Sequence, residues 1–333
     1  MLGCHKIEGR KGEMSDVTNP SMINESKKTA FVFPGQGAQR VGMGKDIYDG
    51  SKAAREVFQE ADDALGIKLT KIMFEGPEEE LTRTLNTQPA ILTMSLACLR
   101  AAEEWLGEHN MPTPDYVAGH SLGEYSSLVA TGVLSTSDAV RLVRERGRLM
   151  QEASDVQPSG MAAVIGLDEL SLEEICSETG TYISTLNTED QIVIAGDRVN
   201  LAVAVDLAGA RGAKRVISLQ VSGAFHTSYM KPAEQGMVKV LNDVTFQDPI
   251  APVIANCSGN PLHTGNEIRE ELLNQICSPV QWRRSVSYLK NANVNQFFEI
   301  GPGKVLAGMI RNTHPEAEII GINDIDGVRA LGA

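Results

Sequence analysis

The sequence predicts an α/β protein in which a small α+β subdomain is inserted into a larger α/β domain. Three observations lead to this prediction. Short apolar runs that end at proline or glycine alternate with longer segments of helical spacing. Residues 160–221 follow the order β-α-β-β-α-β. The chain of 333 residues, 42% of them hydrophobic, is also long enough to bury a large core.

The first half of the chain alternates strands and helices. Residues 29–33, Thr-Ala-Phe-Val-Phe, form an apolar run that stops at Pro34, as expected of a buried strand that leads into a loop. From Pro89 to Leu106 the apolar residues have the spacing of one helix face. We also expect a strand at 115–118 and helices at 121–130 and 135–152, the last capped by Ser135.

The second half of the chain supplies the subdomain and completes the main domain. Within 160–221 we expect strands at 161–167, 182–187, 191–195 and 215–221, and helices at 170–176 and 199–210. This order is that of a ferredoxin-like unit. Beyond it we expect strands at 253–255 and 296–300 and helices near 228–243, 265–277 and 281–290.

Composition excludes several classes of function. With 30 Lys and Arg against 43 Asp and Glu, the net charge of −13 disfavours binding to nucleic acid or to an anionic membrane surface. The five cysteines form no Cys-x-x-Cys pair, so we predict neither a metal site nor a disulfide framework. No apolar run is long enough to span a membrane. We expect a cytoplasmic protein whose polar residues 1–28 form a disordered N-terminal extension.

A Gly-x-Ser-x-Gly sequence, Gly119-His120-Ser121-Leu122-Gly123, lies between a predicted strand and a predicted helix. This position is typical of a nucleophile elbow, a sharp turn that exposes the serine hydroxyl. Glycine lets neighbouring backbone approach closely, and the helix start directs N–H groups at a developing oxyanion. The alternative is an ordinary Gly-Ser turn that caps a helix. We predict that Ser121 is a nucleophile.

A serine hydroxyl is a weak nucleophile unless a base accepts its proton. Among the six histidines, His226 is the best candidate. It follows a predicted strand that ends at Val221, through the small residues Ser222-Gly223-Ala224, which suit a loop packed close to a site. His120 is adjacent to Ser121 and is expected to point away from it. The alternative for His226 is a structural histidine after a strand.

The glycine-containing segment Gly35-Gln36-Gly37-Ala38-Gln39 follows the first predicted strand. It fails the dinucleotide pattern at Arg40, where glycine is needed, and it fails the Walker A pattern at Gln39 and Asp46. It could instead place backbone N–H groups as the second half of an oxyanion hole. The alternative is a plain glycine turn.

The predicted helix at 135–152 contains several arginines, which would ordinarily form a solvated face: Arg141, Arg144, Arg146 and Arg148. Leu142, Gly147 and Met150 mark its apolar side, and Arg146 is next to Gly147. We therefore predict that Arg146 turns inward. A buried guanidinium needs an anion, and a carboxylate bound by two hydrogen bonds is its natural partner.

Together these motifs resemble the malonyl-CoA:acyl carrier protein transacylases and the related acyltransferase domains of fatty acid and polyketide synthases. The resemblance covers nearly all of residues 29–325. The motifs that carry it, in chain order, are Phe33-Pro34-Gly35-Gln36-Gly37, Gln88-Pro89-Ala90, Gly119-His120-Ser121-Leu122-Gly123-Glu124-Tyr125, Arg146-Gly147, Met161-Ala162-Ala163-Val164, Asn187, Ile194-Ala195-Gly196, Phe225-His226, Pro279-Val280-Gln281-Trp282 and Gly301-Pro302-Gly303-Lys304.

The resemblance implies transfer of a malonyl group through a malonyl-serine. Ser121 would form the ester, His226 would be the general base, and Arg146 would hold the free carboxylate of the malonyl group. The backbone N–H groups of Gln36 and Leu122 would form the oxyanion hole. The implied partners are malonyl-CoA and an acyl carrier protein, with coenzyme A and phosphopantetheine as substrate carriers and no other cofactor. We expect a monomer.

Three further residues receive roles from the resemblance. A backbone carbonyl orients the histidine in this family, and it is expected here at Gln281. Asn187 would lie near the active site. Phe225 would be the bulky residue beside the base that favours malonyl over methylmalonyl.

The resemblance also implies an α/β-hydrolase-like catalytic domain built from 29–156 and 223–325, with the ferredoxin-like subdomain at 157–222. Three alternatives stay open: a trans-acting polyketide synthase acyltransferase, an acyl hydrolase of the same fold, and a silent protein that only binds the carrier. Arg146 argues against a hydrolase of simple acyl groups. Because such carrier proteins are acidic, we expect Arg283 and Arg284, with Lys304 behind them, to steer docking.

Overall fold

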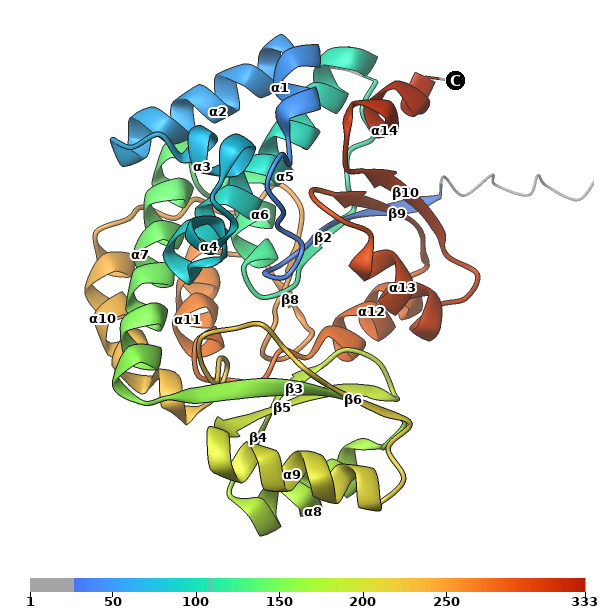
Figure 1. Ribbon diagram of the computed structural model, residues 1–333. Helices are drawn as coiled ribbons and strands as arrows, with labels where there is room; N and C mark the ends of the chain where they lie inside the picture. Colours follow the sequence, from blue (N-terminus) through green and yellow to red (C-terminus); the bar gives the residue numbers. More distant parts are fainter. Residues whose placement is uncertain (1–26, 108–109, 333) are drawn as a thin grey trace, which may run out of the picture.

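The structure is a computed structural model that describes residues 27–107 and 110–332 (Figure 1). Two sheets organise this part of the chain, one of six strands and one of four. The extension predicted at 1–28 falls mostly on residues 1–26, which lie outside the described residues. Lys28 is already the first residue of a strand, so the predicted boundary is too late.

The larger sheet has the order β10-β9-β1-β2-β7-β8. Its pairs are parallel from β10 to β7, and β8 is antiparallel to β7. Phe31 and Phe33 of β1 belong to one apolar cluster and Ala30 and Val32 to another, so both faces of the strand are buried. This explains why its sequence is continuously apolar. The strands are β1 (Lys28–Phe33), β2 (Tyr116–Gly119), β7 (Val253–Ile254), β8 (Pro261–Leu262), β9 (Val294–Ile300) and β10 (Glu318–Ile322).

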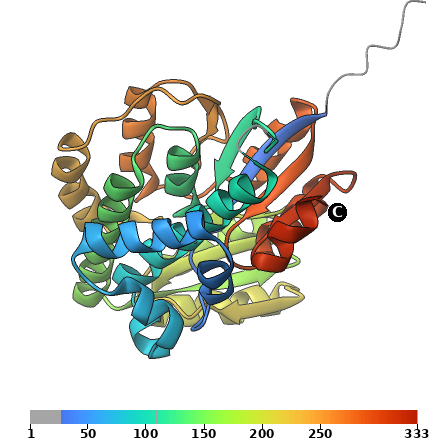
Figure 2. The same ribbon diagram turned by 90° about the horizontal axis from the view of Figure 1, so that it is seen from above.

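Helices cover both faces of this sheet (Figures 1 and 2). The helices α12 and α13 belong to the cluster that contains Ala30, whereas α2, α5, α7 and α10 belong to the cluster that contains Phe31. The helices of this part are α1 (Lys45–Gly50), α2 (Lys52–Leu65), α3 (Leu69–Glu75), α4 (Glu78–Thr82), α5 (Thr84–Leu106), α6 (Gly123–Ala130), α7 (Thr136–Val156), α10 (Lys231–Asn242), α11 (Gly265–Gln275), α12 (Trp282–Asn291), α13 (Val305–Thr313) and α14 (Ile325–Arg329), with short 3₁₀ turns at Ser228–Met230 and Ala330–Gly332.

The smaller sheet is antiparallel, with the order β4-β5-β3-β6. One face packs on α8 and α9, and from the other face Met161, Ala163 and Val193 join the core of the larger part. Two backbone hydrogen bonds between β4 and Val280 join the parts: Leu186 N–H to the Val280 oxygen at 2.8 Å and Val280 N–H to the Ser184 oxygen at 3.0 Å. The elements are β3 (Ser159–Ile165), α8 (Glu169–Thr179), β4 (Tyr182–Leu186), β5 (Gln191–Asp197), α9 (Arg198–Ala210) and β6 (Arg215–Ser218).

The helix expected from Pro89 begins earlier, at Thr84, and Pro89 lies inside it. A proline removes the N–H that would bond to the carbonyl four residues before it. That carbonyl belongs to Leu85, and Arg144 of α7 donates to it at 3.0 Å. A contact from a neighbouring helix therefore compensates for the missing hydrogen bond. The predicted cap of α7 is present, because the Ser135 hydroxyl accepts from Asp138 N–H at 3.0 Å.

Candidate active site

Ser121 lies in the sharp turn between β2 and α6. Its φ of 52° is in the left-handed region, which is strained for a serine. The flanking glycines are sterically required: a Cβ on Gly119 would lie 1.9 Å from the Gly123 carbonyl carbon, and one on Gly123 would lie 2.0 Å from the Phe33 oxygen. The turn is therefore packed directly against the end of β1. This geometry is that of a nucleophile elbow.

Asn256, which sequence reasoning missed, holds the elbow from the segment after β7. Its side-chain oxygen accepts from Ser121 N–H at 2.7 Å, and its amide nitrogen donates to the Gly119 oxygen at 2.7 Å. Asn256 N–H in turn donates to Glu124 Oε1 at 3.1 Å. No local sequence pattern marks Asn256, because its partners lie more than a hundred residues earlier in the chain.

His226 is the residue that faces the serine hydroxyl. Its Nε2 lies 2.7 Å from Ser121 Oγ, and its Nδ1 lies 2.8 Å from the backbone oxygen of Gln275. Burial, together with the positive charge of Arg146, lowers the pKa of His226 to about 3. The ring is therefore neutral near pH 7, with Nδ1 donating to the carbonyl and Nε2 able to accept the serine proton.

The prediction that Gln281 supplies the orienting carbonyl is wrong, because Gln275 supplies it. Gln281 instead precedes α12, and its carbonyl accepts from Ser285 N–H at 3.0 Å within the first turn of that helix. Gln275 is the last residue of α11 and is fully buried. A helix end leaves carbonyl groups without intrahelical donors, which makes its backbone oxygen available to a histidine.

Arg146 is buried, with 1% of its surface exposed, as the spacing on α7 predicted. Its guanidinium donates to Gln88 Oε1 at 2.7 Å and to Gln275 Oε1 at 2.8 Å, and Nη2 lies 3.4 Å from Ser121 Oγ. These partners are neutral amide and hydroxyl oxygens. The Nε atom has no hydrogen-bond partner among the described residues. A buried cation that only neutral groups contact, beside a nucleophile, can bind an anionic substrate group.

Gln36 and Leu122 both line the cavity beside Ser121. Gln36 belongs to the loop after β1, and Leu122 precedes α6. Within the part of the chain that the structure describes, neither backbone N–H donates to a protein acceptor. Both groups are thus available to an oxyanion formed at Ser121.

The cavity itself has a volume of about 250 Å³ and lies between the two sheets. Ser121, His226 and Arg146 line it, together with Met161, Ala163 and Val193 from the inward face of the smaller sheet. Asn187 and Phe225 line it too. Asn187 Oδ1 lies 2.8 Å from Nε2 of His120, so Asn187 contacts His120 and not His226.

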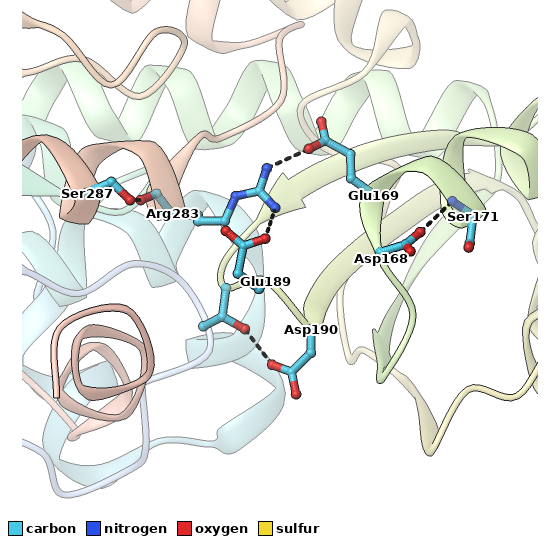
Figure 3. Close-up of polar contacts among 8 residues, drawn as sticks. Asp168, Glu169, Ser171, Glu189, Asp190, Arg283 and Ser287 are labelled. Carbon is cyan, nitrogen blue, oxygen red and sulfur yellow. Dashed lines mark hydrogen bonds and ion pairs between the residues drawn. The ribbon is translucent and has the colours of Figure 1, made fainter.

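Arg283, expected to steer docking, is engaged in ion pairs (Figure 3). It extends from α12 between Glu169 and Glu189 of the smaller part, with 13% of its side chain exposed. Its distance to the Glu189 carboxylate is 3.0 Å. Two carboxylates neutralise this guanidinium, which leaves Arg283 little charge with which to attract an acidic partner. Arg284 and Lys304 are exposed.

Groups of three or more metal-binding side chains are absent from residues 27–107 and 110–332. Among the same residues, no helix is both long and apolar enough to cross a membrane.

Comparison with known proteins identifies the family. The model of the acyl transferase domain family matches residues 30–330. The chain belongs to this family. The acyltransferase is 44% identical over 302 residues to the malonyl CoA-acyl carrier protein transacylase of Bacillus subtilis (strain 168), a match that covers 89% of this chain and 94% of the relative.

Solved structures of similar proteins agree with this assignment. The acyl-carrier-protein S-malonyltransferase from Bartonella henselae is 42% identical to this acyltransferase, with a TM-score of 0.87 over 91% of this chain and 98% of that one. A malonyl-transacylase in complex with its type II PKS acyl-carrier protein is 37% identical, with a TM-score of 0.85 over 90% and 97% of the two chains.

Proposed function

We propose that this acyltransferase moves the malonyl group of malonyl-CoA to the phosphopantetheine thiol of an acyl carrier protein, as an extender unit for fatty acid synthesis. The observation that carries the proposal is Arg146: a buried guanidinium that donates only to neutral oxygens, 3.4 Å from the Ser121 hydroxyl. Malonyl-CoA differs from acetyl-CoA by one carboxylate, and such a cation makes burial of that carboxylate favourable. The names of the relatives support the same substrate and acceptor.

The reaction proceeds in two half-reactions. In the first, Ser121 Oγ attacks the thioester carbonyl while Nε2 of His226 takes its proton, and the N–H groups of Gln36 and Leu122 stabilise the oxyanion. The C–S bond then breaks, and coenzyme A leaves with the proton from His226. This leaves malonyl-Ser121.

The second half-reaction repeats these steps with a new nucleophile. His226 takes the proton of the carrier's phosphopantetheine thiol, and the sulfur attacks the ester carbonyl in the same oxyanion site. The C–O bond to Ser121 breaks, and the serine oxygen recovers the proton from His226. In both halves the Gln275 carbonyl keeps the histidine in the tautomer that accepts at Nε2.

Incubation with radiolabelled malonyl-CoA, followed by mass analysis of the enzyme and of a carrier protein, tests the proposal. A transferase labels Ser121 and then the carrier thiol. Release of free malonate at a rate independent of the carrier would show a hydrolase instead, and absence of label on both proteins would show a silent carrier-binding protein. Either result would refute malonyl transfer.

We further propose that 29–156 with 223–325 form an α/β-hydrolase-like catalytic domain and that 157–222 form an inserted ferredoxin-like subdomain. The strand order β4-β5-β3-β6 and the two helices on one face of that sheet support the second assignment. Asn187 would orient His120 at the cavity wall, and Phe225 would limit the space beside the base. The cytoplasmic location and the monomeric state stay predictions.

A further inference from the structure

One buried carboxyl group, Glu124, is absent from the reaction steps above, although it lies directly behind the site. It is in the first turn of α6, and 1% of its surface is exposed. Glu124 Oε1 accepts from Asn256 N–H at 3.1 Å, and Oε2 accepts from Nε2 of Gln275. Both carboxyl oxygens thus accept hydrogen bonds from residues that contact Ser121 or Arg146.

Gln275 is the more informative of these two residues. Its amide nitrogen donates to Glu124 and, at 3.0 Å, to the Ser121 backbone oxygen, while its amide oxygen accepts from Arg146 Nη2 at 2.8 Å. An amide can satisfy this arrangement in one orientation only, because the acceptors must face its nitrogen and the guanidinium must face its oxygen. Glu124 and the Ser121 backbone oxygen together therefore determine which end of Gln275 meets Arg146.

We propose that Glu124 is a positioning residue for substrate selectivity: by fixing the amide of Gln275, it holds the Arg146 guanidinium where it binds the acyl carboxylate. The inference rests on the proposed malonyl transfer. Glu124 is not among the residues that line the cavity beside Ser121, and its effect on Arg146 passes through the side chain of Gln275.

The isosteric substitution Glu124→Gln separates this role from the packing of the site. Asn256 N–H belongs to the backbone and cannot turn, so the oxygen of the new amide remains opposite it. The new NH₂ group then faces Gln275, whose side chain can rotate and present its oxygen. After that rotation Gln275 Nε2 would face Arg146, and its oxygen would face the Ser121 backbone oxygen. Without the rotation, Gln275 Nε2 would oppose the new NH₂ group. Either orientation leaves an unfavourable contact at Gln275, so its amide no longer holds Arg146 as in the wild type.

The protonation state of Glu124 does not alter this expectation. Burial, with the nearby carboxyl of Glu271, raises the pKa of Glu124 well above its usual range. A protonated carboxyl oxygen still accepts a hydrogen bond, whereas an amide nitrogen does not. The substitution therefore disrupts the contact in either state.

The measurement is kcat/KM for malonyl-CoA and for acetyl-CoA with the full-length enzyme and carrier protein. Glu124→Gln should lower the malonyl to acetyl ratio by about 10- to 100-fold, the loss expected for one charge-assisted hydrogen bond. Glu271→Gln is the matched control, because Glu271 lies on α11 four residues before Gln275 and accepts from Cys257 N–H at 2.8 Å. It should leave the ratio unchanged.

A double-mutant cycle tests whether Glu124 acts through Gln275. Gln275→Met keeps the backbone carbonyl that orients His226 but removes the amide, so it should lower the ratio by itself. Adding Glu124→Gln to Gln275→Met should then change the ratio no further. Additive losses, or equal losses for malonyl and acetyl in Glu124→Gln, would overturn the inference. Lack of malonyl preference in the wild type would instead refute the proposed function.

Discussion

Replacement of Arg146 gives the sharpest test of how the site recognises its substrate. In Arg146→Ala the malonyl carboxylate would enter a buried site without a cation. Removing one partner of a buried ion pair costs about 3–5 kcal/mol, because the other charge stays unpaired. We therefore expect kcat/KM for malonyl-CoA to fall by about 10²- to 5 × 10³-fold. Acetyl transfer should persist or improve, because a neutral methyl group meets no unpaired charge.

Two further variants control for the helix and for the charge. Arg144→Ala removes an arginine two residues earlier on α7 that donates to the Leu85 carbonyl rather than into the cavity. It should leave the malonyl to acetyl ratio near the wild-type value. Arg146→Lys should restore malonyl transfer poorly, since an ammonium cannot donate to Gln88, Gln275 and a carboxylate with the fixed geometry of a guanidinium.

The assay is carrier-dependent transfer at varied concentrations of each acyl-CoA, with folding checked by thermal unfolding. Equal losses for malonyl and acetyl in Arg146→Ala would refute the carboxylate contact and leave Arg146 a structural role. A folded Arg146→Ala variant with full malonyl transfer would refute it as well.

Three shorter predictions concern the other parts of the site. Ser121→Ala should abolish malonyl labelling of the enzyme, as measured by mass analysis, and labelling of this variant would exclude Ser121 as the nucleophile. His226→Ala should slow labelling by about 10²- to 10⁴-fold. Wild type should prefer malonyl-CoA over methylmalonyl-CoA by about 10- to 200-fold, and Phe225→Ala should narrow this preference in competition assays; an unchanged ratio would exclude Phe225 as the cause. Substitution of Arg284 and Lys304 by Glu should raise KM for the carrier but not for malonyl-CoA, and the increase in KM should be smaller at high salt. Equal effects on both substrates would contradict a docking role.

Much of the fold could be predicted because it depends on local signals. The continuous apolar run of β1, the Ser135 cap of α7 and the order of elements in 160–221 are all readable from neighbouring residues. The helices α1 to α4 were not predicted, although α2 has 14 residues and only α1, α3 and α4 are short. The three short helices are too brief for a periodic apolar pattern to stand out. In α2, by contrast, buried Ala54, Val57, Phe58 and Ala61 have the spacing of one helix face, so this helix could have been predicted.

The site shows the same division between local and distant information. The strained turn at Ser121 was predictable because its glycines and its flanking elements are adjacent in sequence. The roles of Gln275 and Asn256 could not be predicted, because they depend on α11 and the segment after β7 packing against the turn at Ser121 in the folded protein. Arg283 illustrates the converse case, since the sequence shows its charge but not the two carboxylates that neutralise it.

The proximity of Arg146 and His226 leads to a final prediction about pH. Burial lowers the pKa of His226 to about 3, and the charge of Arg146 contributes to this shift. A carboxylate bound to Arg146 offsets that charge, so the pKa of His226 should rise toward its ordinary value when malonyl binds, and the histidine becomes a stronger base.

Acetyl has no such group, so the rise should be specific to malonyl. A higher pKa means that His226 becomes protonated, and inactive as a base, at a higher pH. The acid limb of kcat, which reports the bound complex, should therefore lie at higher pH for malonyl-CoA than for acetyl-CoA. The acid limb of kcat/KM that reports His226 of the free enzyme should lie well below pH 6.5 with both substrates. Rapid-mixing acylation across pH 4–8 measures the kcat profiles. Over this range kcat/KM should show no acid limb from His226, because its pKa in the free enzyme is about 3. Identical acid limbs of kcat for the two substrates would show that the Arg146 charge does not tune the base.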